Sequence, residues 1–365
     1  MRLHQIGELK LLKEVRERFS SASKEDSSII VGIGDDAAVI VPQKERIIVT
    51  TDMMNEGVHF DLSYTSPFHL GFKLVSVNVS DIMAMGGQPM YIFLTLSMKK
   101  DTEEEFFWGL YEGVSSAMDI YGVKLLGGDM SAAENDMVVS ATVIGQADKI
   151  ITRGGASVGD KIYITSTLGD SACGLALLQR LTDESRYRVK GYEFRVKSKK
   201  QKKKKNEKVL SLTHNSKLLT LNWSIAEPLI AKHLMPVARD SAELRQYATS
   251  MIDVSDGLFI DLSRICDESN AGAIVYSENI PISKEMKDAA GIMGLDPFML
   301  ATSGGEDYEL LFTAADFPVS AYNKSHNIKV SCIGHIVEKK RIVVDKTGKK
   351  TALKVKGYQH FGSQG

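Results

Sequence analysis

Residues 151–160 read ITRGGASVGD, a glycine-rich polar stretch between two regions of mixed helix and strand patterns. Such a run favours a linker, because glycine and small polar residues interrupt regular structure and are readily exposed to solvent. The run KIYIT at 161–165 follows at once and has the β-branched and aromatic residues of a strand. We therefore place a domain boundary here, with domains over residues 1–148 and 149–365.

The 365-residue chain has the composition of a globular protein, with 43% hydrophobic and 25% charged residues. At roughly 150 residues per domain, this length predicts two domains. The formal net charge of −1 gives no reason to expect nucleic acid or a membrane surface as a partner, since both select a basic bias. The opening run MRLHQIGELKLLKEV is typical of an amphipathic helix and unlike a signal peptide.

The cysteines are three in number, far apart, and set among apolar or small residues: Cys173, Cys266 and Cys332. This pattern is typical of buried free thiols in a reducing compartment. It predicts a cytoplasmic protein with neither a disulfide framework nor a zinc site.

Short β-branched runs alternate with longer helical patterns on both sides of the boundary. Since they interleave without a regular strand–helix–strand repeat, the pattern predicts the α+β class. The expected helices are 66–85, 102–121, 171–181, 241–250 and 258–269. The expected strands are 28–33, 37–41, 46–51, 90–97, 136–146, 161–165, 251–254, 273–276, 308–313, 329–336 and 342–344.

Residues 182–223 interrupt this pattern, since they contain SRYRVKGYEFRVKSKKQKKKKNEK at 185–208. The lysine run has little helical or strand periodicity, so we interpret the segment as a solvated insertion. Contact with a polyanion is the alternative. A short lysine tract in a protein with almost no net charge is, however, usually only a solvated loop.

Aspartates follow apolar runs or lie within helical ones in five short motifs: GIGDD (32–36), TTD (50–52), NVSD (78–81), GGD (127–129) and DVSDG (253–257). A carboxylate in such a place needs a compensating cation. Mg²⁺ is normally bound by one or two carboxylates together with substrate phosphates. A helix cap or a turn is the better explanation for one isolated aspartate. Five motifs of one kind instead favour metal-bound phosphates.

Glycines accompany these aspartates at positions 32, 34, 127 and 128, where bare backbone lets N–H groups approach an anion closely. The P-loop pattern GxxxxGK[ST] is absent, and so is the HRD and DFG set of protein kinases. A phosphate site in this chain therefore needs a different scaffold.

Longer stretches carry a more specific signal: GIGDDAAVI (32–40), TTDMMNEGVHF (50–60), VNVSDIMAMGGQP (77–89), LLGGD (125–129), ITRGGASVGDKIYIT (151–165), GDSACGLALL (169–178), IDVSDGLFIDL (252–262), SGGEDYELLFT (303–313) and KGYQHF (356–361). Together they resemble the thiamine-monophosphate kinase family, which belongs with the aminoimidazole-ribonucleotide synthetase-like ATP-binding proteins. The resemblance covers nearly the whole chain outside residues 181–223. It implies a two-domain α+β fold, with an N-terminal α/β domain that binds ATP and Mg²⁺ and pairs in a homodimer, and a C-terminal α+β domain.

The resemblance also implies roles for individual residues. Magnesium ions would be held around the nucleotide phosphates by Asp36, Thr50, Thr51, Asp52, Asp81, Asp129, Asp253 and Asp256. ATP would be faced by Gly128, Asp129, Arg153 and Ser255. The thiamine monophosphate site would be lined by His59, Glu306 and Tyr358.

These roles make physical sense, although each has a structural alternative. A carboxylate and an aromatic face suit a cationic thiazolium ring, and a guanidinium suits a phosphoryl group. His59 could instead be a hydrogen-bonded structural residue, and Tyr358 could simply pack near the chain end. Arg153 could form a salt bridge in the linker.

The resemblance implies direct in-line transfer of the terminal phosphoryl group of ATP to thiamine monophosphate, which gives thiamine diphosphate and ADP. The acceptor is already an anion, so no strong general base, no side-chain nucleophile and no phosphoenzyme are needed. Several Mg²⁺ ions would offset the repulsion between the phosphates.

Two alternatives are another ATP-using enzyme of the same superfamily and a non-catalytic nucleotide-binding homologue. The absence of a cysteine before Cys173 disfavours selenophosphate synthesis, and the final HFGSQG disfavours the hydrogenase maturation protein. The non-catalytic alternative has one local indication. Met130 follows Gly-Gly-Asp, where this family usually has threonine, although Ser131 could supply the missing hydroxyl.

Overall fold

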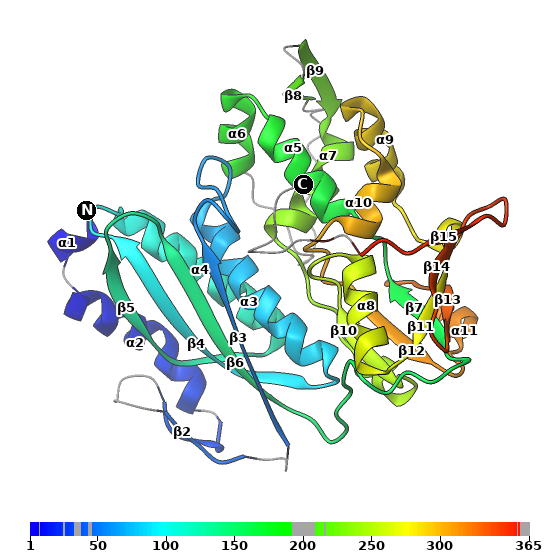
Figure 1. Cartoon of the computed structure of the whole chain (residues 1–365). Coiled ribbons are helices and arrows are strands. Elements are labelled where there is room, and N and C mark those ends of the chain that lie inside the picture. Colours follow the sequence, from blue (N-terminus) through cyan, green and yellow to red (C-terminus); the bar gives the residue numbers. More distant parts are fainter. Residues whose placement is uncertain are drawn as a thin grey trace. The chain divides into compact units, whose positions relative to one another are not determined.

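The computed structural model describes residues 1–6, 8–24, 26–32, 38–42, 46–191, 209–214, 217–355 and 357 (Figure 1). Contacts divide the chain into two compact units, Met1–Ile150 and Ile151–Gly365. Each unit combines helices with a sheet, which confirms the α+β class. Within the described residues, no helix has the length and apolar character that a membrane span requires.

The first unit combines a four-stranded sheet with helices. Its elements are α1 (Leu3–Ile6), α2 (Glu8–Lys24), β1 (Ile29–Val31), β2 (Val39–Ile40), β3 (Ile47–Asn55), α3 (Pro67–Ala84), β4 (Gln88–Lys99), α4 (Glu104–Tyr121), β5 (Lys124–Ala133) and β6 (Val138–Gln146). The sheet order is β3, β6, β4, β5, antiparallel except that β5 runs parallel to β4. Helix α3 packs on β3, β4 and β6 and on α4, so the two helices form a layer against one face of the sheet (Figure 1).

Helices α3 and α4 approach each other so closely that each has a glycine at the contact. A Cβ atom on Gly71 would lie 2.0 Å from the carbonyl oxygen of Leu110. One on Gly113 would lie 2.0 Å from the carbonyl oxygen of Phe68. Both distances are far below van der Waals contact, so only glycine permits this spacing of the two backbones.

The second unit contains a seven-stranded sheet with helices around it. Its elements are β7 (Lys161–Thr165), α5 (Asp170–Arg180), α6 (Asp183–Lys190), β8 (Val209–His214), β9 (Lys217–Asn222), α7 (Trp223–Leu234), β10 (Ser250–Asp253), α8 (Leu258–Glu268), β11 (Gly272–Tyr276), α9 (Lys284–Met293), α10 (Pro297–Ser303), β12 (Leu310–Ala314), α11 (Val319–Ser325), β13 (Val330–Val337), β14 (Arg341–Val344) and β15 (Lys350–Ala352). The sheet order is β10, β12, β7, β13, β11, β14, β15, and only β11 and β14 are parallel neighbours. The rings of Tyr163 and Phe312 stack with centroids 5.1 Å apart on this sheet.

The helix predicted for residues 241–250 is wrong. The structure has only a 3₁₀ turn at Leu244–Gln246, and β10 begins at Ser250. The cause is tertiary, because β10 pairs with β12 and the hydroxyl groups of Ser250 and Thr313 lie 2.7 Å apart across that pair. Strand β5 and helices α7, α9, α10 and α11 were not predicted.

The interpretation of residues 182–223 as a solvated insertion is also wrong for its described part. That part forms α6 and the antiparallel pair of β8 and β9. Leu210, Leu212 and Leu221 are at most 1% exposed, so the hairpin contributes apolar side chains to the core of the unit. The lysine run at 202–205 lies outside the described residues.

Gly113→Ala is expected to lower the free energy of unfolding by about 2 kcal/mol, because its methyl group would have to displace the backbone of α3. The matched control is Gly291→Ala in α9, where an added Cβ meets nothing within 4 Å. This control should raise the free energy of unfolding by up to about 1 kcal/mol, since alanine is the better helix former. Urea unfolding followed by circular dichroism measures both. Equal urea midpoints for Gly113→Ala and the unchanged protein would contradict the close helix contact.

Candidate functional site

The end of β10 and a distant turn form one cluster of predicted site residues in the second unit. The N–H of Glu306 donates to the carbonyl oxygen of Ser255 at 2.7 Å, and the N–H of Tyr308 donates to that of Val254 at 2.9 Å. These bonds extend the β10–β12 pairing beyond the ends of both strands. Asp253, Ser255 and Glu306 are therefore brought together from positions about 50 residues apart in the sequence.

Glycines make this close contact possible. A Cβ atom on Gly305 would lie 2.5 Å from the carbonyl oxygen of Ser255, and Gly257 has a φ of 128° just before α8. A Cβ atom on Gly357 would lie 2.7 Å from the carbonyl oxygen of Asp256. The chain thus passes Asp256 one residue before Tyr358, which itself lies outside the described residues.

Carboxylates are concentrated at the start of α8, and one guanidinium bridges two of them. Arg264 donates to Asp256 and to Asp261, each at 2.5 Å. Asp261 also accepts the N–H groups of Asp256 and Gly257, each at 3.1 Å. Burial raises the pKa of Asp261 to about 6, despite the opposing charge of Arg264. Asp253 is only 3% exposed.

The turn that carries Glu306 is strained. Glu306 and Tyr308 have φ values of 64° and 50°, in the left-handed region that favours glycine. Such residues cost about 1–3 kcal/mol each and persist where surrounding contacts fix them. The glutamate at this turn is therefore held in place by its environment.

Two buried acids that sequence reasoning missed provide much of that environment. Glu309 is fully buried and forms ion pairs with Lys232 and, through two hydrogen bonds of 2.7 and 2.6 Å, with Arg239. Burial raises the pKa of Glu309, but the two cations outweigh this effect and lower it overall. Asp307 accepts the N–H groups of Gly169 and Ser171, and burial raises its pKa to about 7. The signal in the sequence was the placement of three acids, in EDYE at 306–309, directly before the apolar run LLFT.

A second cluster lies in the first unit, between the edge strand β3 and α3. The Thr50 hydroxyl donates to Asp81 at 2.7 Å, and the N–H of Asp52 donates to the Asn78 side chain at 2.8 Å. Thr50, Asp52 and Asp81 are thus brought together, with oxygen atoms of the kind that Mg²⁺ prefers. Asp36, predicted for the same ions, lies outside the described residues.

Thr51 and Asp129 lie on the opposite face of the same sheet. Thr51 accepts a hydrogen bond from Thr142 at 3.1 Å, while Asp129 is in register with Thr95. The strands β3 and β5 are separated by β6 and β4, which is roughly 14 Å at about 4.8 Å per strand. One copy of this unit therefore does not bring Asp129 to Thr51 or Asp52.

Gly128, the residue before Asp129, has a packing role within the sheet. Its φ is 156°, and a Cβ atom there would lie 1.9 Å from the carbonyl oxygen of Leu94 on β4. This close approach of two strands accounts for the glycine without an anion.

His59 and Arg153 are each held by local contacts. The N–H of Asn55 donates to Nδ1 of His59 at 3.0 Å, so the neutral ring carries its proton on Nε2. The backbone around Arg153 is fixed by Ser269, whose hydroxyl accepts the N–H groups of Gly155 and Ala156 at 3.2 and 3.1 Å. Ser269 follows the end of α8 and Ser255 precedes its start, so roughly 16 Å of helix separates them.

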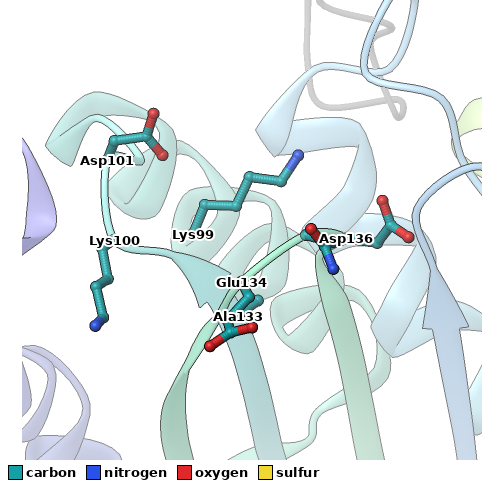
Figure 2. A pocket seen from close by; sticks show the side chains of 7 residues that line it. Lys99, Lys100, Asp101, Ala133, Glu134 and Asp136 are labelled. Atoms are coloured by element: carbon teal, nitrogen blue, oxygen red, sulfur yellow. The ribbon is translucent and has the colours of Figure 1, made fainter.

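No group of three or more His, Cys, Asp or Glu side chains among the described residues is arranged to hold a metal ion by itself. A surface pocket of about 630 Å³ lies where β4 and β5 end and β6 begins (Figure 2). None of the predicted site residues lines it. Its lining residues are Lys99, Lys100, Asp101, Ala133, Glu134, Asn135 and Asp136.

Comparisons with known proteins place this arrangement in a family. Residues 34–147 match the family described as AIR synthase related protein, N-terminal domain, and residues 208–346 match the corresponding C-terminal domain. The thiamine-monophosphate kinase of Aquifex aeolicus is 32% identical over 363 residues, which cover 99% of this chain and 100% of the relative. Among solved structures, thiamine-monophosphate kinase from Stenotrophomonas maltophilia has a TM-score of 0.73 at 31% identity, over 92% of this chain and 96% of that one. AaThiL complexed with AMPPCP and TMP has a TM-score of 0.69 at 31% identity, over 99% of both chains. The chain belongs to the thiamine-monophosphate kinase family.

Proposed function

We propose that this protein transfers the terminal phosphoryl group of ATP to thiamine monophosphate, forming thiamine diphosphate and ADP. The observation that carries the proposal is the match along 99% of both chains to AaThiL complexed with AMPPCP and TMP. The relative from Aquifex aeolicus, which is named a thiamine-monophosphate kinase, supports it over its whole length. The carboxylate clusters in both units provide residues that suit such a reaction.

Mg²⁺ is the metal that these residues fit best. Asp52 and Asp81 supply two carboxylates beside the Thr50 hydroxyl, which is the ligand number that Mg²⁺ commonly takes from a protein when phosphates complete its shell. When bound, the ions would offset the negative charge of the phosphates. We propose as ligands Asp36, Thr50, Thr51, Asp52, Asp81, Asp129, Asp253 and Asp256.

The chain itself would bind and orient the two substrates. The acceptor phosphate is an anion, so positioning and charge stabilisation can suffice for transfer without a side-chain base. The Glu306 carboxylate suits the cationic thiazolium ring, and we propose His59 and Tyr358 as the other residues that bind thiamine monophosphate. We propose that ATP contacts Gly128, Asp129, Arg153 and Ser255. The guanidinium of Arg153 and the hydroxyl of Ser255 are good hydrogen-bond donors to phosphate oxygens.

We also propose that two copies pair through the face of the first sheet that carries Thr51 and Asp129. Val49 and Met53 lie on this face and are 60% and 56% exposed, which is unusual for large apolar side chains in a strand. Because Asp129 is remote from Thr51 within one copy, pairing there would bring candidate ligands of both copies to one interface. Exposed apolar residues and an incomplete ligand set thus have one explanation.

The state of the cysteines bears on where the protein is located. All three cysteines are free, with Cys173 and Cys266 buried and Cys332 partly exposed. This state fits a reducing cytoplasm, where we place the protein.

Met130 is in register with buried Leu96, so its side chain faces the helical layer. Ser131 shares the open face with Asp129 and donates to Ser97 at 3.3 Å. This placement supports Ser131 as the source of the hydroxyl near Asp129.

Release of ADP with thiamine monophosphate, and its absence with unphosphorylated thiamine, is the direct test of the reaction. A coupled ADP assay with several phosphorylated acceptors at the same concentration separates thiamine monophosphate from other phosphorylated compounds. ATP binding without ADP release for any acceptor would instead support the non-catalytic alternative.

Asp81→Asn is expected to lower kcat at least about 100-fold, because it removes a charge that compensates the metal. Thr50→Val should raise the Mg²⁺ concentration for half-maximal rate by about 10-fold, since it removes a hydrogen bond that orients the Asp81 carboxylate. The matched control is Asp119→Asn, an exposed aspartate on α4, which should leave both quantities unchanged. A normal Mg²⁺ dependence in Asp81→Asn would contradict the assignment.

Val49→Glu combined with Met53→Glu is expected to convert the dimer to a monomer, because it places charges on the face proposed to pair. Val158→Glu, at a residue of the second unit that is 62% exposed, is the control and should remain dimeric. Sedimentation velocity at several protein concentrations distinguishes the two forms. The proposal of pairing through this face is refuted if the double variant keeps the sedimentation coefficient of the unchanged protein.

A further inference from the structure

Two neighbouring residues in the last turn of α7 contact two different carboxylates of the strained turn. Lys232 forms its ion pair with Glu309, while Nδ1 of His233 lies 3.2 Å from the Glu306 carboxylate. Adjacent positions of one helix thus reach residues at both ends of the segment 306–309. A rigid helix fixes both contacts at once.

The three acids of this segment differ in exposure. Asp307 and Glu309 are fully buried, whereas the Glu306 side chain is 26% exposed. The strain in the backbone and the buried ion pairs therefore leave one carboxylate of the three accessible from outside. That carboxylate is the one proposed to face the thiazolium ring.

The His233 side chain contacts this carboxylate and is shielded from solvent. Its side chain is 5% exposed, so it has little surface to offer a ligand directly. Its Nδ1 atom is also 3.2 Å from the hydroxyl of Ser171, at the start of α5. Nδ1 of His233 thus contacts both the start of α5 and the Glu306 carboxylate, so it can determine which rotamer that carboxylate adopts.

We propose that His233 is a positioning residue that directs the Glu306 carboxylate toward the cationic ring of the acceptor. The inference rests on the proposed function, which it deepens by naming a residue that controls recognition of the acceptor. A histidine that acts in this way affects binding of thiamine monophosphate and leaves ATP binding unchanged. A histidine that only fills the core would affect stability and neither substrate.

The test compares three substitutions by steady-state kinetics with each substrate varied in turn. His233→Leu should raise KM for thiamine monophosphate by about 10-fold, with kcat and KM for ATP within about twofold of the unchanged protein, because a misplaced group weakens only the interaction it makes. His233→Asn should recover most of the loss, since its amide N–H can replace that of Nδ1. Ser171→Ala is the control, because it removes the other neighbour of the ring and keeps the contact with Glu306.

A double-mutant cycle isolates the contact itself. Glu306→Gln alone should raise KM for thiamine monophosphate at least as much as His233→Leu, and the double variant should be no worse than Glu306→Gln. Additive effects, or an unchanged KM in a folded His233→Leu protein that turns over normally, would overturn the inference alone. No ADP release by the unchanged protein with thiamine monophosphate would overturn the proposed function and this inference with it.

Discussion

The cluster of predicted site residues in the second unit depends on a short continuation of the β10–β12 ladder beyond its regular strands. Two backbone hydrogen bonds, from Glu306 and Tyr308 to the carbonyl groups of Ser255 and Val254, join segments about 50 residues apart. Backbone bonds of this kind position side chains more firmly than contacts between long side chains, because fewer rotatable bonds intervene. The grouping of Asp253, Ser255 and Glu306 follows from this pairing.

The acids near this turn lie close together, and the negative charge of each is stabilised by different groups. Arg264 bridges Asp256 and Asp261, two cations surround Glu309, and backbone N–H groups solvate Asp307. A buried ion pair contributes little net stability, but removing one partner leaves a charge that is costly to bury. The network therefore favours one arrangement of the turn more than it raises overall stability.

The sequence predicted the elements whose side-chain pattern is local and missed those that depend on tertiary contacts. Strong apolar periodicity identified α3 and α8, and β-branched runs identified β3 and β7. Strand β5 was not predicted, because glycines such as Gly127 and Gly128 are uncommon inside strands, and here Gly128 permits the close approach to β4. The hairpin of β8 and β9 was obscured by the neighbouring lysines.

The candidate site was accessible to sequence reasoning only in part. Aspartate motifs and a family resemblance indicated the residues, and the structure groups Thr50 with Asp52 and Asp81 and places Ser255 beside Glu306. No pattern in the sequence revealed which face of the sheet each residue occupies. That information arises from strand order and register, which depend on pairings between distant segments.

Side chains alternate along β3, so Thr50 and Asp52 face α3, whereas Thr51 faces the open side of the sheet. A shift of β3 by one residue against β6 would exchange the two sides, so both sets of groups would be lost together. A shift by two residues would preserve the sides and misplace the groups only along the strand. The register of this edge strand therefore decides which of its residues face α3, and a single-residue deletion within it would disturb more side chains than most substitutions.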